Sequence, residues 1–205
     1  MKLVNLEKIL RDKGIKMFST RELKLLLGLS EKTSQQLVWR YKSKGYIIEL
    51  KKGLYALKTN RPNTYQIANR LYQPSYISFD TALSYHGVIP ETIYAITSAT
   101  TRNTREFEVE GVRYTYHRLK KPYFIGYKLV RYLDAGVNMA EPEKSLADYL
   151  YYIDIRQRGL HYERIDLKKI KKARLKEYIK LYKRPGMIKL MERIYAEQRR
   201  PPKIY

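Results

Sequence analysis

The hydrophobic pattern of residues 19–58 predicts two helices separated by a short turn and followed by two strands. The first helix begins after Ser19, because Glu22 stands three residues later and completes the sequence of a capping box. Apolar residues then recur at helical spacing as far as Gly28, which ends this helix, and Ser30 caps the next one. Two helices joined by so short a turn must cross at a steep angle.

The second helix is predicted to run from Ser30 to about Lys44, with Gly45 as its stop. Its outer face carries side chains that suit DNA bases and phosphates: Lys32, Thr33, Gln35, Gln36 and Arg40. The single tryptophan, Trp39, lies in the same helix, and two positions are open to it, packed on the following hairpin or close to a DNA backbone.

Residues 46–50 and 54–58 are each predicted as a strand, and Lys51 and Lys52 lie in the turn between them, where they are placed to contact phosphates. With a further helix expected over about residues 4–13, this is the order of elements in a winged helix-turn-helix, which lays a helix in a DNA groove. Such folds also serve as protein-interaction modules, and a Lys-rich helix face is usually only solvated. Both alternatives stay open.

The region after the hairpin changes to short strands rich in β-branched and aromatic residues, mixed with helices. A linker is expected at residues 60–63, with Glu110-Gly111 as a hairpin turn and Ser78 as a helix cap. We predict helices over residues 64–72, 79–86 and 143–156, and strands over residues 76–78, 93–99, 106–109, 112–119 and 124–130.

The last part of the chain is predicted to be helical and basic. Asp166 caps a helix in which lysines follow one another at i+4 steps: Lys168, Lys172, Lys176 and Lys180. Like charges at that spacing repel, and a phosphate backbone would relieve the repulsion. The plain alternative is a solvated, Lys-rich surface. A second amphipathic helix follows Pro185-Gly186.

These elements predict an α+β protein in three parts. The first is a winged helix-turn-helix over residues 1–60, the second a small α+β antitoxin-like domain over residues 61–160, and the third a basic helical extension over residues 161–205, packed on the second. The 205 residues, of which 44% are hydrophobic, are enough to bury a core in two modest domains.

Charge points to a polyanionic partner, because the net charge of +22 is far above what solubility requires. It is unevenly spread: residues 1–60 hold 14 basic and 5 acidic side chains (+9), residues 61–150 hold 11 and 9 (+2), and residues 151–205 hold 17 and 6 (+11). Double-stranded DNA is the expected partner.

Cysteine is absent, so disulfides and thiolate metal sites are excluded, which fits a reducing compartment. The first residues lack the apolar run of a signal peptide, and no segment approaches transmembrane length. We therefore expect a cytoplasmic, nucleoid-associated protein without a membrane partner.

Three blocks follow one another in the middle of the chain: SYISFDTALSYHG at residues 75–87, YHRL at 116–119 and AEPEKSLAD at 140–148. With the winged helix in front, they resemble the AbiEi-type antitoxins over about residues 1–160. The resemblance implies a transcriptional regulator that represses its own operon and counteracts a nucleotidyltransferase-fold toxin encoded beside it, as in type IV toxin-antitoxin and abortive-infection systems of antiviral defence. Where that family more often has Thr-Pro-Glu-Lys, this chain has Glu141 before Pro142.

Four side chains of these blocks invite an acid–base interpretation: Asp80, His86 and His117 with Ser78. A structural role is simpler for His86, because it stands beside Gly87 at a predicted helix end, where a cation or a capping donor is useful. We expect no catalytic residue.

Glu106, Glu108 and Glu110 invite a metal-binding interpretation, but their alternation along one strand places them on a solvated sheet face. No metal-ligand pattern, phosphate loop or nucleophile motif is found, and we expect neither a metal nor a cofactor. Two alternatives to an operator-binding regulator stay open. One is a metal-dependent DNA-processing enzyme or nuclease; the other is a protein-binding antitoxin without operator readout.

Overall fold

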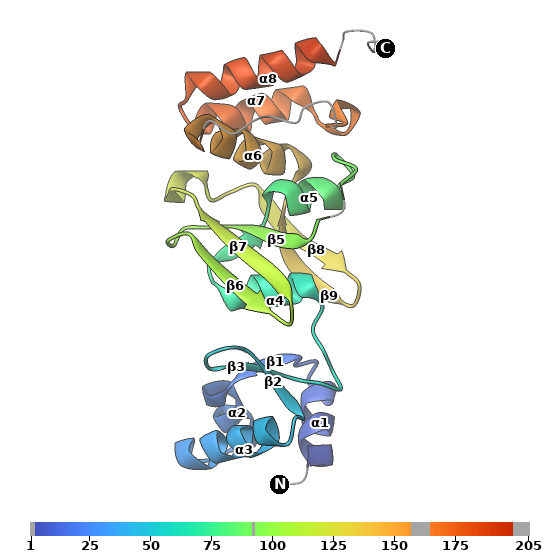
Figure 1. Cartoon of the computed structure of the whole chain (residues 1–205), viewed down its shortest axis with the longest axis vertical. Coiled ribbons are helices and arrows are strands. Elements are labelled where there is room, and N and C mark those ends of the chain that lie inside the picture. The colour runs from blue at the N-terminus through green and yellow to red at the C-terminus, as the bar shows by residue number, and fades with distance from the viewer. Residues whose placement is uncertain (1–2, 92, 157–164, 199–205) are drawn as a thin grey trace. The chain divides into compact units, whose positions relative to one another are not determined.

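The computed structural model describes residues 3–91, 93–156 and 165–198 (Figure 1). The protein is mixed α+β and divides into two compact units, Met1–Leu71 and Tyr72–Tyr205. The first unit therefore ends later than the boundary predicted after residue 60. The basic C-terminal region forms no third unit, because its helices share the core of the second.

Unit 1 has the predicted succession of helices and strands, with one addition. Its elements are α1 (Leu3–Asp12), β1 (Met17–Ser19), α2 (Thr20–Leu27), α3 (Glu31–Ser43), β2 (Ile47–Lys51), β3 (Leu54–Leu57) and α4 (Thr64–Leu71). The three strands form an antiparallel sheet in the order β1-β3-β2. The strand β1 was not predicted, because three residues are too few to show a period.

The predicted capping box is present at the start of α2. The Ser19 amide donates to Glu22 Oε2 over 2.7 Å, and the Glu22 amide donates to Ser19 Oγ over 3.1 Å. Gly28 ends the helix at φ +63°, a left-handed conformation that glycine adopts without a steric cost. Ser30 caps α3 by accepting from the Thr33 amide. These local signals orient the two helices.

Unit 2 is built on a sheet in the order β6-β7-β5-β4-β9-β8. Its strands are β4 (Ser75–Ile77), β5 (Ala95–Thr100), β6 (Arg105–Val109), β7 (Val112–Arg118), β8 (Tyr127–Tyr132) and β9 (Ala135–Ala140). The β4–β9 and β5–β7 pairs are parallel and the other neighbours antiparallel. The predicted hairpin turn joins β6 to β7, with Glu110 and Gly111 at φ +49° and +79°. The strand β9 was not predicted.

Helices of unit 2 pack around one central helix (Figure 1). They are α5 (Phe79–Tyr85), α6 (Pro142–Arg156), α7 (Lys172–Leu181) and α8 (Pro185–Glu197), with 3₁₀ turns at Lys121–Tyr123 and Leu167–Lys169. α6 contacts α5, α7 and α8, and nine of its described residues, among them Lys144 and Asp148, are buried. α6 is therefore the core helix of this unit.

Two local predictions for unit 2 are wrong. The helix predicted to begin after Asp166 is a 3₁₀ turn, and α7 begins only at Lys172, because Ile170 is extended and buried. Ser78 precedes α5 but its hydroxyl makes no capping bond; it donates to a residue of α6 instead. The sequence Arg-Arg-Pro-Pro at residues 199–202 is expected to form a frayed tail, and these residues lie outside those that the structure describes.

Candidate nucleic-acid interface

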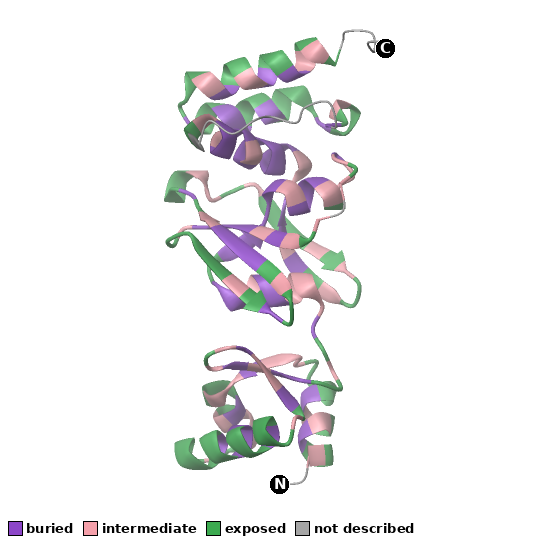
Figure 2. Cartoon of the chain, viewed as in Figure 1, coloured by how far each residue is buried: buried purple, intermediate pink, exposed green. Residues whose placement is uncertain are grey.

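The outer face of α3 is exposed along its whole length (Figure 2). Its inner face is buried in the core of unit 1 through Ser34, Leu37, Val38 and Tyr41. The five predicted contact residues of this helix are all exposed: Lys32, Thr33, Gln35, Gln36 and Arg40. The 3.6-residue period of the helix therefore separates core from surface as the sequence predicts.

Three of these side chains also have partners within the helix. The Thr33 hydroxyl lies 2.8 Å from the Ser30 hydroxyl at the N-cap, and the Gln35 amide donates to Glu31 over 3.3 Å. The Arg40 guanidinium lies 5.1 Å from the centre of the Tyr41 ring. Thr33 and Gln35 must give up these hydrogen bonds, or share them, before they can bind a base.

The two lysines of the hairpin lie in different surroundings. Lys52 is exposed in the turn before Gly53, as predicted. Lys51 is only half exposed, because it belongs to β2 and its ammonium group donates to the Leu71 carbonyl. The prediction that both lysines stand at the tip of the turn is therefore wrong for Lys51.

An ion pair joins the end of α3 to the hairpin. The Lys42 ammonium group binds the Glu49 carboxylate, and this hydrogen bond lowers the pKa of Glu49 below its ordinary value. The contact holds β2, the first strand of the hairpin, against α3. It also neutralises one lysine beside the exposed face.

The predicted C-terminal lysines are exposed, but they do not share one helix. Lys168 lies in the 3₁₀ turn, whereas Lys172 and Lys176 lie on α7. The Lys172 ammonium group lies 4.6 Å from the centre of the Tyr195 ring on α8. The uniform i+4 row of charges is thus shorter than predicted, and it begins at Lys172.

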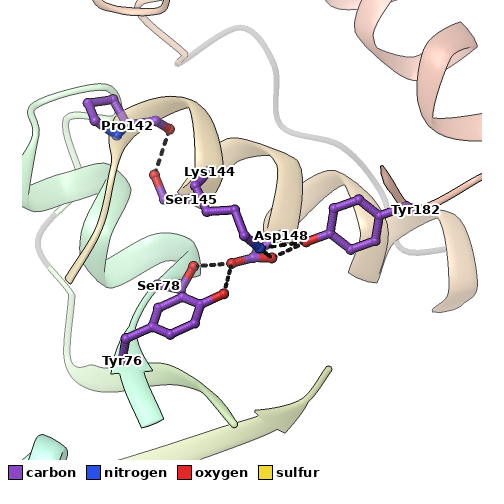
Figure 3. A network of polar contacts seen from close by, with 7 residues as sticks. All are labelled: Tyr76, Ser78, Pro142, Lys144, Ser145, Asp148 and Tyr182. Atoms are coloured by element: carbon purple, nitrogen blue, oxygen red, sulfur yellow. Dashed lines mark hydrogen bonds and ion pairs between the residues drawn. The ribbon is translucent and has the colours of Figure 1, made fainter. Parts of the chain in front are cut away.

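A buried polar network in unit 2 was not predicted from the sequence (Figure 3). Lys144 and Asp148, one turn apart on α6, form an ion pair with both side chains 0% exposed. Ser78 Oγ and Tyr76 Oη donate to Asp148 Oδ2 over 2.7 and 3.1 Å, and Lys144 Nζ donates to Tyr182 Oη over 2.7 Å. The Tyr182 hydroxyl also donates to Asp148.

Burial dominates the proton equilibria of this network. It lowers the pKa of Lys144, although Asp148 opposes that change, and it raises the pKa of Tyr76 and Tyr182 well above the ordinary value, with Asp148 adding to the rise. Both tyrosines are therefore neutral donors. A charged pair without solvent contact is satisfied by these donors and is not accessible to a substrate.

The network joins two of the blocks noted in the sequence. Tyr76 and Ser78 belong to the block at residues 75–87, and Lys144 and Asp148 belong to the block at residues 140–148. One sequence signal could have predicted this network: a lysine and an aspartate stand at i+4 spacing among apolar neighbours. Such a pair on a buried helix must find hydrogen-bond partners.

The residues considered for acid–base chemistry have separate partners. His86 Nε2 lies 2.8 Å from the Ala140 carbonyl oxygen, and burial lowers the pKa of His86. His117 packs edge-on against Phe79, with ring centres 4.9 Å apart. Asp80 is half exposed on α5, and the Ser78 hydroxyl is committed to Asp148.

The glutamates considered for a metal site lie at one edge of the sheet. Glu106 and Glu108 are exposed on β6 opposite Thr115 and Arg113, and Glu110 lies in the turn. Among residues 3–91, 93–156 and 165–198, no group of three histidines or carboxylates is placed to hold a metal ion. The sheet-face interpretation accounts for Glu106 and Glu108, whereas Glu110 lies beyond the strand, in the turn.

A pocket of about 450 Å³ lies at the start of β4. It is lined by Gln73, Pro74, Ser75, Phe124, Tyr127 and Asn138. Tyr127 stacks on Tyr76 with ring centres 4.5 Å apart, which connects the pocket wall to the buried network. No carboxylate, imidazole or ammonium group lines the pocket, so its lining offers shape and amide contacts rather than acid–base chemistry.

No protein-family model matches the chain, and a comparison with curated proteins gives no match either. The resemblance to AbiEi-type antitoxins therefore stays a prediction. Within the described residues, no helix combines the length and the apolar character needed to cross a membrane.

Proposed function

We propose that the protein is a cytoplasmic, DNA-binding transcriptional regulator whose unit 1 acts as a winged helix-turn-helix. In this proposal α3 is the recognition helix and the β2–β3 hairpin is the wing. Gln36 and Arg40 recognise the base sequence of the DNA, while Lys52 and the exposed lysines of α7 contribute phosphate contacts.

One observation carries the proposal: an exposed polar and basic helix face on a short two-helix unit, followed by a hairpin with an exposed lysine at its turn. The helix spans 13 residues, which is about 20 Å at 1.5 Å per residue, and a helix of that length fits a major groove. The positive charge of residues 1–60 favours approach to a polyanion.

The test is a titration of the full chain with its own upstream DNA and with a scrambled duplex, at two salt concentrations. We expect preference for the upstream DNA that survives the higher salt and is lost in Gln36→Ala. Gln73→Ala, an exposed glutamine outside unit 1, is the matched control and should bind as the wild type does. Equal, salt-labile binding to both duplexes would contradict operator readout.

We propose further that the regulator is the antitoxin of a toxin-antitoxin operon and counteracts a nucleotidyltransferase-fold toxin. Two blocks that carry the resemblance to AbiEi-type antitoxins supply the buried network of unit 2, so the similar residues belong to one structural centre. Such a centre supports a shared domain, and the proposed toxin-directed activity belongs to that domain.

Growth on co-expression tests this role. The wild type should restore growth to cells that express the adjacent nucleotidyltransferase-fold protein, and Gln36→Ala should do so as well, since its change lies in unit 1. A neighbouring gene of another kind, or growth that stays arrested with the wild type, would contradict the antitoxin role while leaving operator binding intact.

A further inference from the structure

The most exposed aromatic side chain of unit 1 is a tryptophan on its proposed recognition helix. Trp39 is 72% exposed, although tryptophan is a residue that proteins usually bury to a large extent. Most of the ring is therefore left uncovered by the hairpin, and packing on the hairpin was one of the two positions open to it from the sequence. Within the described part of the chain, no hydrogen bond, ion pair or ring contact involves it.

The position of Trp39 on α3 is central. Successive residues of a helix are rotated by about 100° around its axis. Viewed along that axis, Trp39 therefore points in a direction between those of Lys32 and Gln35 and nearly opposite to that of Tyr41, which is buried in the core. The residue opposite the core is the one that projects furthest from it. The indole ring therefore stands at the crest of the face that carries the predicted polar contacts.

The surroundings of this ring are polar and basic. Lys32, Gln36 and Arg40 are exposed on the same side of α3, and residues 1–60 carry 14 basic against 5 acidic side chains. A flat apolar ring within such a face matches a polyanion that also offers apolar groups. In the major groove of DNA, the C5-methyl group of thymine is the apolar group that a base pair presents.

We propose that Trp39 is a specificity-determining residue that recognises the C5-methyl group of thymine in the operator. This inference rests on the proposed function and adds an apolar base contact to the polar base contacts proposed there. The amide of Gln36 and the charge of Arg40 hold the helix in the groove, and the indole edge then closes over a methyl group and excludes water from it.

The experiment uses the full chain and two duplexes: the preferred upstream DNA, and the same duplex with deoxyuridine in place of thymine, which removes only the methyl groups. Because Trp39 is the single tryptophan, its fluorescence reports on this position alone. The variants are Trp39→Ala and, as a matched control, Leu129→Ala, whose side chain is also 72% exposed but lies on β8 of unit 2.

We expect the fluorescence of the wild type to change on binding the preferred duplex. Trp39→Ala should bind that duplex at least about tenfold more weakly, as loss of a tryptophan anchor does at interfaces. Deoxyuridine should lower the affinity of the wild type by about fourfold for each contacted methyl group, which is the effect expected from burying one carbon group. It should not lower the affinity of Trp39→Ala further. Leu129→Ala should match the wild type.

Four results would overturn the inference. Unchanged affinity of Trp39→Ala, or an equal effect of deoxyuridine on both proteins, excludes Trp39 as the methyl reader while sequence preference itself persists. A fluorescence change that follows protein concentration without DNA, with self-association lost in Trp39→Ala, assigns the ring to an interface between two copies. If the wild type shows no sequence preference, the proposed function fails first, and this inference fails with it.

Discussion

Lys144 and Asp148 form an ion pair in the centre of unit 2, one helical turn apart and without solvent exposure. Removing two charges from water is costly unless hydrogen bonds satisfy them, and the hydroxyl groups of Tyr76, Ser78 and Tyr182 do so here. Tyr182 follows α7, Tyr76 lies in β4 and Ser78 directly follows that strand, so the pair connects α6 to the sheet and to the C-terminal helices.

Breaking this pair from one side should be severely destabilising. Lys144→Met leaves the Asp148 charge buried without its partner, and we expect a loss of about 3–5 kcal/mol in the free energy of unfolding, measured by urea denaturation. The double variant Lys144→Met with Asp148→Leu should lose less than either single variant.

The matched control is a second ion pair with the same spacing. Arg193 and Glu197 on α8 are also four residues apart, but their side chains are 63% and 26% exposed. Arg193→Met should cost no more than about 1 kcal/mol. Equal losses at the two pairs would contradict the structural role of the buried network.

Alkaline pH should destabilise the protein through its buried tyrosines. Burial raises the pKa of Tyr114 to about 12, and it raises the pKa of Tyr116 as well. Because a phenol in the unfolded chain ionises near pH 10 while native Tyr114 keeps its proton, the unfolded state binds fewer protons and stability falls as pH rises. The contribution of Tyr114 is complete below about pH 10 and is lost between about pH 10 and 12, at about 1.4 kcal/mol per pH unit.

Urea denaturation at several alkaline pH values measures this dependence. Tyr114→Phe should make the dependence shallower, because phenylalanine cannot ionise. Tyr94→Phe, at a position 89% exposed, should leave it unchanged. The same slope in all three proteins would count against burial of the Tyr114 phenol.

The two hairpin lysines should differ in DNA binding. Lys52→Ala should reduce the slope of log affinity against log salt concentration by about 1, the loss of one phosphate contact. Lys51→Ala should change that slope less and lower the thermal stability of the protein instead, because the Lys51 ammonium group donates to the Leu71 carbonyl. Identical slopes for the two variants would refute this division of roles.

The lysines of α7 provide the test of a second DNA contact. If Lys172 and Lys176 bind phosphates, replacing both by alanine should reduce the salt slope by about 2, while Lys128→Ala on β8 should not. Substitution is the suitable test, because deletion of this region would remove Leu175, Tyr182 and Met187 from the core. An unchanged slope in the double variant would restrict DNA binding to unit 1.

The capping box should contribute to the stability of unit 1. Ser19→Ala removes the oxygen that accepts from the Glu22 amide, and we expect a loss of about 1 kcal/mol in the free energy of unfolding. Ser43→Ala, an exposed serine at the end of α3, is the control and should stay within about 0.5 kcal/mol of the wild type. Equal losses would show that the cap adds nothing.

Local sequence signals account for most of the elements of unit 1. Ser19, Gly28 and Ser30 act on the backbone within three or four residues, and the period of α3 separates its core from its exposed side chains, so local order was sufficient. The same holds for the Glu110-Gly111 hairpin in unit 2, whose two positive φ angles are a property of the turn.

Contacts between groups far apart in the sequence depend on how the elements pack, and local patterns did not predict them. The hydrogen bond from Ser78 to Asp148 crosses 70 residues, and that from Lys51 to Leu71 crosses 20, and neither changes the local periodicity of the chain. The same holds for the partner of Lys172 on α8 and for the break before α7, where burial of Ile170 outweighs a continuous helix. Periodicity records which face of an element is apolar, whereas a buried charge is satisfied by whichever donors the packing brings to it.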